Sequence, residues 1–376
     1  MTKKDAEVYF DRQTDRQTDR QTDRQTDRIE YIDTLKGFAS LCVVLGHIAG
    51  GYLEAGAYSE ASGLLYNIYN LIYAFHMSLF MILSGYLYYT AYFNDSGKPD
   101  RQRIRHQMRN QIGVYVLFSV AMGLFKIFVA SLSSGAVNRK VTLFDVLMIW
   151  AKPISPYWYL YVLILLYQIF SFKKLTGVNK WILLGILITA SIYGQVINIQ
   201  WFAISKVLYY ALFFFIGIAG KKYRDWIIGS KWLTVASFII AIGACVRFWN
   251  NRQNISKYIN QILFVSIIAA LGISLMLWYI FEHISIIGNS RLLNMCGRYS
   301  LEIYVLHCFF TAGLRAVFLK VGIHNVYISI ILNLIVSITV PILFSIFCKK
   351  LNIHGLFFKP VTYVKKCHKG KKFFQN

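Results

Sequence analysis

The sequence predicts an all-α polytopic membrane protein with about ten transmembrane helices and both termini in the cytoplasm. Of its 376 residues 56% are hydrophobic and its mean hydropathy is positive, which is more apolar than a soluble domain requires. Apolar runs of about 18 to 22 residues recur along the chain, and each is long enough to cross the hydrocarbon layer. Basic residues gather in the short connections between these runs. Backbone groups in lipid must pair internally, so the runs are expected to be helices.

The first 28 residues are a polar arm. Residues 11–28 read DRQTDRQTDRQTDRQTDR, a tetrapeptide repeat that cannot bury a core, so we expect arm 1–28 to be disordered in the cytoplasm. The codons GAC, AGA, CAG and ACA would encode it as a repeated GACA tract, whose slippage would shift the reading frame. We therefore hypothesise on/off phase variation, which a nucleotide sequence without the repeat would refute. No cleavable signal peptide is evident, so the run from Leu35 is expected to act as a signal anchor.

The apolar segments follow in order between residues 29 and 348. We place them at 35–53, 65–92, 111–131, 156–172, 181–199, 202–220, 232–249, 261–281, 301–320 and 326–348. A cytoplasmic N-terminus puts the most basic loops inside, at 94–110, 173–180 and 221–231. Five basic residues in outer loops depart from this pattern: Arg139, Lys140, Lys152, Arg252 and Lys257.

The formal charge of +23 comes from basic residues whose distribution along the chain agrees with the same topology. Because the basic residues border membrane segments, the pattern indicates a positive-inside protein and argues against a nucleic-acid partner. Segment 349–376 is expected to be a basic cytoplasmic tail that anchors the chain and suits anionic membrane lipids. The six cysteines form no CxxC pair and show no short spacing to a histidine cluster, so we expect neither disulfides nor a metal site.

The first apolar segment, DTLKGFASLCVVLGH, carries two ionisable residues, Lys36 and His47. Eleven helical steps of 100° place both side chains on one face, about 16 Å apart along the axis. A membrane histidine can serve an interhelical hydrogen bond, or it can be functional. A functional imidazole would accept a hydroxyl proton or carry an acyl group. A cation at the cytoplasmic mouth can hold a phosphate.

Four stretches together resemble the signatures of acyltransferase family 3, membrane proteins that O-acetylate bacterial surface glycans. They read RIEYIDTLKGFASLCVVLGHI, FHMSLFMILSGYLYY, SPYWYLYVLILLY and GRYSLEIYVLH, in the family's order. The resemblance implies about ten membrane helices, acetyl-CoA as cytoplasmic donor and a sugar hydroxyl as acceptor. It makes His47 the catalytic residue and Lys36 the basic residue of the opening signature, where arginine is more common. Some family members carry an extra extracytoplasmic domain, for which this chain has no long hydrophilic segment.

The other signatures suggest supporting residues. His76 would orient His47 or the acceptor, whereas Ser84 would either contact substrate or, with Gly85, allow close helix packing. The family analogy assigns Arg105 and Arg109, together with Lys36, to the phosphates of CoA.

Aromatic and polar residues of the last two signatures have two interpretations each. Trp158 and Tyr161 would belong to an aromatic belt or form a sugar platform, with Trp158 the stronger candidate. Glu302 would pair with Arg298 four residues away, or it would orient a catalytic imidazole. His307, about 140° from Glu302 around the same helix, is a substrate-binding candidate.

We therefore predict a multi-pass protein of the bacterial inner membrane that transfers acetyl groups from acetyl-CoA to a polysaccharide or lipopolysaccharide sugar, without a metal. Direct attack with His47 as base and an acetyl-histidine relay both remain open. A transporter or flippase for a lipid-linked glycan is the alternative, although the chain shows no convincing inverted repeat and only Pro341 interrupts a segment. A structural subunit, for which His47 would be dispensable, is a third possibility.

Overall fold

The computed structural model describes residues 30–94, 97–132, 141–172, 178–224, 230–250 and 263–364. These residues form helices and connecting turns, and within them extended pairing is limited to one bridge between Phe93 and Pro99. Outside the described residues lie the repeat arm 1–28, Cys367 and four of the five basic residues predicted in outer loops, namely all except Lys152. The other five cysteines are free thiols, as expected.

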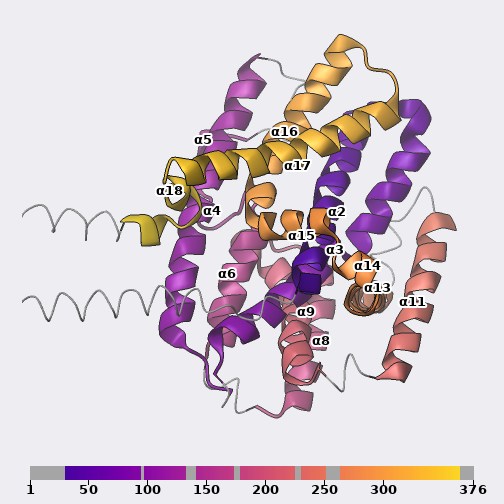
Figure 1. Ribbon diagram of the computed structural model, residues 1–376, viewed down its shortest axis with the longest axis vertical. Helices are drawn as coiled ribbons and strands as arrows, with labels where there is room; N and C mark the ends of the chain where they lie inside the picture. Colours follow the sequence, from indigo (N-terminus) through magenta and orange to yellow (C-terminus); the bar gives the residue numbers. More distant parts are fainter. Residues whose placement is uncertain are drawn as a thin grey trace, which may run out of the picture.

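The described helices occupy the predicted apolar segments and several of the connections (Figure 1). In chain order they are α2 (Glu30–Glu54), η1 (Ser59–Ala61), α3 (Ser62–Tyr92), α4 (Arg101–Leu132), α5 (Leu143–Leu147), α6 (Trp158–Phe170), α8 (Lys180–Val196), η2 (Trp201–Ala203), α9 (Ile204–Lys222), α11 (Lys231–Asn250), α13 (Leu263–His283), α14 (Ser285–Gly288), α15 (Arg291–Arg298), α16 (Ser300–Val321), α17 (Val326–Lys350) and α18 (His354–Phe358).

Seven of these helices are long and apolar enough to span a membrane: α2, α3, α4, α9, α13, α16 and α17. The helices α6, α8 and α11 are apolar but shorter, and they coincide with the other three predicted segments. The all-helical class is therefore confirmed, whereas the count of ten crossings and the placement of the termini stay predictions.

Burial in α17 is inverted relative to a soluble protein, as a lipid environment requires. The polar side chains of Asn333, Ser337 and Ser345 are fully buried, while Leu343 is 62% exposed. The buried polar groups are satisfied internally, since Ser337 Oγ donates to Asn333 Oδ1 over 3.0 Å and Ser345 Oγ donates to a carboxylate oxygen of Glu302 over 3.1 Å. The apolar exterior of α17 thus suits hydrocarbon.

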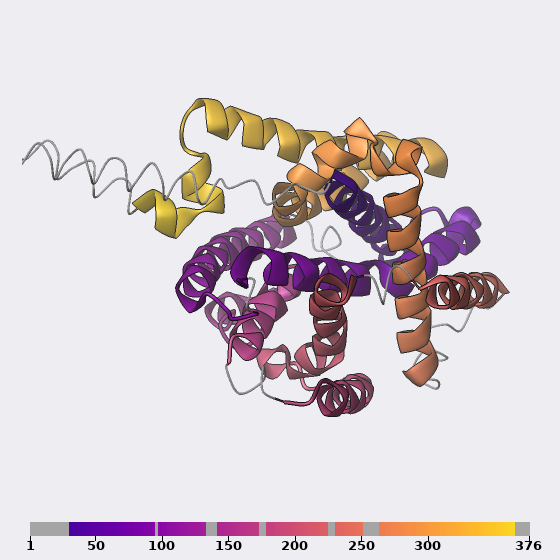
Figure 2. The ribbon, with the colours of Figure 1, turned by 60° about the horizontal axis from the view of Figure 1, so that its bottom comes forward.

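Glycines set the closest helix contacts in the bundle. A Cβ on Gly37 of α2 would lie 1.8 Å from the carbonyl oxygen of Leu293 in α15, and one on Gly297 would meet α2 equally closely. Gly85 of α3 approaches the backbone of α9 in the same way. Small residues let helix backbones meet in lipid, where packing drives association. These contacts hold α2 against α15 and α3 against α9, inside the bundle that Figure 2 shows from another angle.

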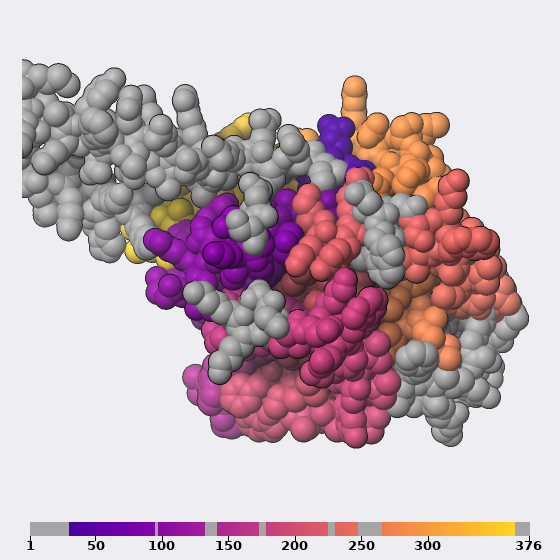
Figure 3. Space-filling view, turned by 90° about the horizontal axis from the view of Figure 1, so that it is seen from below, coloured from indigo at the N-terminus to yellow at the C-terminus, as the bar shows by residue number. Residues whose placement is uncertain are grey.

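The basic stretch before the third predicted segment is helical, where the sequence predicted a loop. Helix α4 begins at Arg101 because Pro99 and Asp100 provide a start signal: Asp100 Oδ1 accepts hydrogen bonds from the backbone N–H groups of Gln102 and Arg103, at 3.1 and 3.0 Å. The stretch is strongly charged and has no apolar face, so hydrophobic periodicity could not indicate that it is helical. The start of α4 lies on the face seen from below in Figure 3, where the segments near residue 100 are purple.

The first part of the predicted tail packs on the bundle. The ring of Phe358 in α18 stacks on Phe118 of α4 with centroids 5.8 Å apart. Beyond α18, Thr362 and Asn110 share hydrogen bonds, one of them from Asn110 Nδ2 to Thr362 Oγ1 over 3.0 Å. The chain therefore stays ordered on α4 past the last predicted segment.

Candidate active site

A cavity of about 770 Å³ opens among the C-terminal halves of α2 and α4, the N-terminal half of α3 and residues 304–316 of α16. The connection from Val141 to Pro156 and the beginning of α9 complete its wall. Its volume falls in the range of small-molecule sites. The cavity brings together residues from both ends of the chain.

His47 lies in the wall of this cavity on α2. It is partly exposed, and within the described residues neither of its ring nitrogens has a hydrogen-bond partner. The ring of His307 on α16 lies beside it, with centroids 5.0 Å apart. His47 therefore presents an imidazole to the cavity that is free to accept a proton.

His76 and His307 are held in one tautomer each by their own helices. The Nδ1–H of His76 donates to the carbonyl oxygen of Ile72 over 2.7 Å, and that of His307 donates to Ile303 over 2.9 Å. Each ring in its neutral form therefore carries its lone pair on Nε2. His76 is buried and lines the cavity, whereas His307 is fully buried behind it. The structure thus brings the predicted residues His47, His76 and His307 together.

Cys308 joins this group beside His307. Its Sγ lies 3.2 Å from His307 Nε2, and it also lines the cavity. The ligand-type atoms of His47, His307 and Cys308 all lie within 4.8 Å of one another. The sequence shows His307 and Cys308 as an adjacent pair without a histidine cluster beside them. The fold adds His47 to this pair, which no spacing in the sequence indicates.

Several residues of the cavity wall are basic. Lys126, Lys152, Lys206 and Arg315 contribute four cations against the carboxylates of Glu54 and Asp145. Lys126 Nζ donates to the carbonyl oxygen of Ser155 over 3.2 Å, and Arg315 donates to Gly51 over 2.8 Å. A wall of this charge attracts anionic ligands.

Helix α5 is fixed in this wall by a capping box. Thr142 Oγ1 accepts from the backbone N–H of Asp145 over 3.2 Å, and the Asp145 carboxylate accepts from the backbone N–H of Thr142 over 2.9 Å. The hydrogen bond from the Thr142 backbone, followed by that from its hydroxyl, lowers the pKa of Asp145 below its usual value.

The predicted sugar-contact residues separate into two groups. Trp158 lines the cavity, its ring stacked on Tyr210 with centroids 5.3 Å apart and with Lys206 Nζ 4.5 Å from its centroid. Tyr161 donates to the carbonyl oxygen of Trp150 over 2.8 Å and is not part of the cavity lining.

Ser84 also lies outside the lining. Its hydroxyl shares a hydrogen bond of 2.7 Å with the Tyr159 hydroxyl, next to the close contact of Gly85 with α9. This position agrees with the packing interpretation of the Ser84–Gly85 pair.

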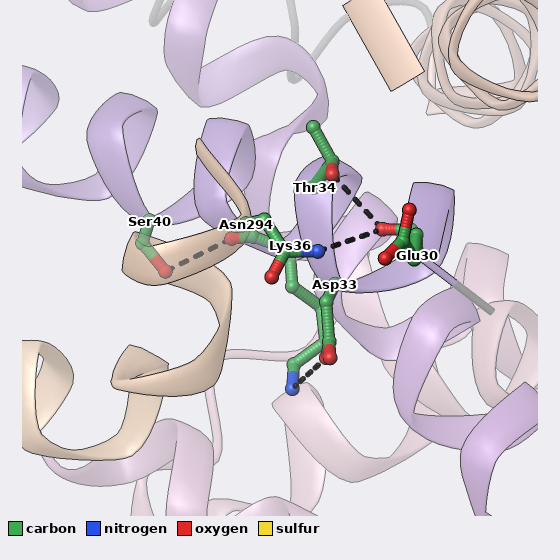
Figure 4. Close-up of polar contacts among 6 residues, drawn as sticks. All are labelled: Glu30, Asp33, Thr34, Lys36, Ser40 and Asn294. Carbon is green, nitrogen blue, oxygen red and sulfur yellow. Dashed lines mark hydrogen bonds and ion pairs between the residues drawn. The ribbon is translucent and has the colours of Figure 1, made fainter. Parts of the chain in front are cut away.

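The predicted phosphate-binding cations lie away from the cavity. Lys36 is in the first half of α2, where its Nζ pairs with Asp33 Oδ1 over 3.5 Å (Figure 4). The same figure shows Asn294 of α15 against the first turn of α2, where its Nδ2 donates to the Glu30 carbonyl over 3.3 Å. Arg105 and Arg109 are exposed near the start of α4.

Glu302 has partners other than those predicted. Its Oε1 accepts from Ser345 Oγ and lies 3.0 Å from His354 Nε2 in α18. Arg298 is exposed at the end of α15, a separate helix, so the predicted i,i+4 pair does not form. Glu302 orients an imidazole, but that imidazole belongs to the C-terminal segment and not to the cavity.

Sequence reasoning missed the cavity residues whose partners are distant in the chain. Lys126, Lys206 and Arg315 interrupt or border apolar segments, and such ionisable residues at membrane depth are the signal that could have identified them. Their convergence with Trp158 follows only from the packing of α4, α9 and α16.

Comparison with known proteins gives one family. The family model described as an acyltransferase domain matches residues 29–348, nearly the whole described chain. No curated protein and no solved structure matches.

Proposed function

The chain belongs to acyltransferase family 3, and on that premise we propose that it is an O-acetyltransferase of the bacterial inner membrane. It takes acetyl groups from cytoplasmic acetyl-CoA and transfers them to a hydroxyl of a cell-surface polysaccharide or lipopolysaccharide sugar. Membership of the family makes the chain an acyltransferase, and its apolar helices make it a multi-pass membrane protein. The donor, the acceptor and the residue roles are the proposal.

The observation that carries this proposal is the position of His47. An imidazole with no hydrogen-bond partner among the described residues faces a cavity of about 770 Å³ from a helix that is long enough to span the bilayer. A general base must reach the proton that it removes, and a free imidazole at a cavity wall fulfils this requirement. The burial of two further histidines beside it makes a purely structural role a poor explanation.

Direct transfer is the mechanism that we propose. The acceptor oxygen attacks the thioester carbonyl carbon while His47 takes the hydroxyl proton. The C–S bond then breaks, the acetyl ester forms, and the proton passes to the departing CoA thiolate. His76, with its lone pair on Nε2, positions the acceptor hydroxyl by accepting a hydrogen bond.

The donor is proposed to enter from the end of the bundle that carries Lys36, Arg105 and Arg109. Their positive charges suit the phosphates of CoA at a cytoplasmic surface. Lys36 lies about 16 Å below His47 on the same helix, so an extended pantetheine arm must bridge the two levels.

The acceptor is proposed to enter by the basic wall of the cavity. Trp158 offers a ring face for a sugar, and Lys206 and Lys152 border the same opening. Trp158→Ala should raise the acceptor KM more than it lowers kcat. The reason is that a ring stacked on the sugar binds the substrate equally well in the ground state and in the transition state.

Mass spectrometry of surface glycans tests the function. Cells that express the wild type should carry acetylated sugars, and cells with His47→Ala should lack the acetyl increment at equal amounts of folded membrane protein. Cys245→Ser, in α11 and outside the cavity lining, is the control that should retain acetylation. Unchanged acetylation in His47→Ala would remove His47 from the mechanism, and no acetyl group in either strain would favour glycan transport.

Acetyl-histidine separates the two mechanisms. Incubation with acetyl-CoA alone should release no stoichiometric CoA if transfer is direct. A burst of CoA together with acetylated His47 would establish the relay instead.

A further inference from the structure

The side chains of His47, His307 and Cys308 form a cluster at the inner wall of the cavity. We propose that this cluster binds one zinc ion, and that the bound ion inhibits the protein by occupying His47. The ion is an effector and not part of the acyl-transfer chemistry. The binding part of the inference is independent of the proposed function, whereas the inhibition rests on it.

The ligand types suit zinc. Imidazole nitrogen and thiolate sulfur are both donors that this borderline-soft ion prefers, and zinc sites with three protein ligands leave a fourth position to water. Within the described residues, no other group of three or more histidine, cysteine or carboxylate side chains lies close enough together to bind a metal. No carboxylate takes part, so hard cations such as magnesium are disfavoured.

The distances are close to those of a bound ion. Cys308 Sγ lies 3.2 Å from His307 Nε2, and the ligand atoms of all three residues lie within 4.8 Å of one another. Zinc bonds of about 2.0 to 2.3 Å in tetrahedral geometry place ligand atoms roughly 3.3 to 3.7 Å apart. The His307–Cys308 distance therefore lies just below this range, and the distances from His47 to the other two ligand atoms need to shorten by at most about 1.5 Å.

The surroundings prepare His307 for this role. Its Nδ1–H donates to the Ile303 carbonyl, which fixes the ring and leaves Nε2 directed at Cys308. Histidines that ligate metals commonly donate their second nitrogen to a carbonyl in this way. The contact exists without an ion, so it lowers the reorganisation that binding requires.

The cavity provides the route for an ion. His47 and Cys308 both line it, so an ion that enters the cavity reaches two of the three ligands directly. The carboxylates of Glu54 and Asp145 border the same space, while Lys126, Lys152, Lys206 and Arg315 oppose a cation. Binding replaces the thiol proton of Cys308, which leaves to the cavity water, so affinity should increase with pH.

Cobalt titration of the purified detergent-solubilised protein tests binding. Cobalt(II) bound to a thiolate gives a near-ultraviolet charge-transfer absorption, which should appear at one equivalent in the wild type and in the matched control Cys245→Ser. It should be absent in Cys308→Ser, a nearly isosteric change that removes the sulfur, and zinc should displace it. No absorption in the wild type, or an equal one in Cys308→Ser, would overturn the site.

Zinc inhibition of CoA release tests the consequence. Cys308→Ser should retain transfer without zinc but need at least about 10-fold more zinc for half inhibition than the wild type or Cys245→Ser. If cobalt binds as expected but wild-type and Cys308→Ser transfer respond to zinc alike, the inhibitory role is wrong and the site stands. If no transfer occurs in any sample, the proposed function fails while the cobalt result still decides the site.

Discussion

The rings of His47 on α2 and His307 on α16 lie with their centroids 5.0 Å apart, although the two helices stand near opposite ends of the chain. His307 is fixed by Ile303, whereas His47 has no hydrogen-bond partner among the described residues. The pair therefore combines one imidazole that is oriented by a backbone hydrogen bond with one whose ring nitrogens are available to a ligand.

Substitution of His47 should reduce turnover while leaving donor binding intact. His47→Ala removes the base, so kcat for acceptor-dependent CoA release should fall by about 10² to 10⁴. The KM for acetyl-CoA should stay within about threefold, because the cations assigned to the donor lie elsewhere. Stopped-time assays in proteoliposomes measure both constants, and a fall in donor affinity alone would place His47 in donor binding.

The hydrogen bond that His354 of α18 donates to Glu302 should hold the C-terminal segment. Glu302→Ala removes the acceptor of His354 and Ser345, so limited proteolysis should cut near α18 faster than in the wild type. Glu302→Gln retains an oxygen acceptor and should stay protected. Loss of transfer in a protected Glu302→Gln protein would show that the carboxylate has a chemical role as well.

The crossing of α2 and α15 should tolerate no added methyl group. In Gly37→Ala the new Cβ would meet the Leu293 carbonyl oxygen, and separation of the two backbones should cost about 3 kcal/mol or more of folding free energy. Thermal unfolding in detergent measures the loss. Gly185→Ala is the control, since open space surrounds that position and its apparent melting temperature should not fall.

The buried polar network of α17 should contribute more to the free energy of unfolding than an apolar side chain at Asn333 would. Asn333 donates to the Tyr52 hydroxyl over 3.3 Å and to the Thr311 carbonyl over 3.2 Å. Asn333→Leu leaves these groups with fewer partners and should destabilise the fold by about 1 to 3 kcal/mol. Ile335→Val, at a position that is 51% exposed, should change unfolding little in the same assay.

The capping box of α5 should weaken in acid. Because folding lowers the pKa of Asp145, its contribution is present above the unfolded value of about 3.9 and is lost as pH falls through the lower folded value. Hydrogen exchange in residues 142–148, corrected for its intrinsic pH dependence, should accelerate below about pH 4. Asp145→Asn should exchange rapidly at all pH values, and an unchanged profile would show that the box does not order α5.

The sequence predicted the helices well and the site in part. Apolar length and charge located α2, α3 and α17 to within a few residues, because the hydrocarbon layer imposes them locally. The family signatures contain His47, His76 and His307, which the fold places at or behind one cavity, whereas their roles stay predictions. The Glu302–Arg298 pairing failed because a break between α15 and α16 separates these residues, and no periodicity reveals such a break.

The remaining residues depend on tertiary structure. Cys308 could not be predicted as a site residue, because the spacing of cysteines to one another says nothing about a histidine on another helix. Lys126, Lys206 and Arg315 meet at one cavity only through helix packing. The distances between residues on different helices are set by close helix contacts such as those at Gly37 and Gly85. A single sequence does not indicate which helix each glycine contacts.

The contact between α2 and α16 also bears on biosynthesis. The first helix enters the bilayer early in translation, yet its His47 meets His307 only after α16 has left the ribosome and inserted. A nascent chain halted after α13 contains His47 and His76 but lacks His307 and Cys308. Insertion of α16 is thus the step that completes this cluster of side chains, and a nonsense or frameshift lesion upstream of α16 leaves a fragment without it.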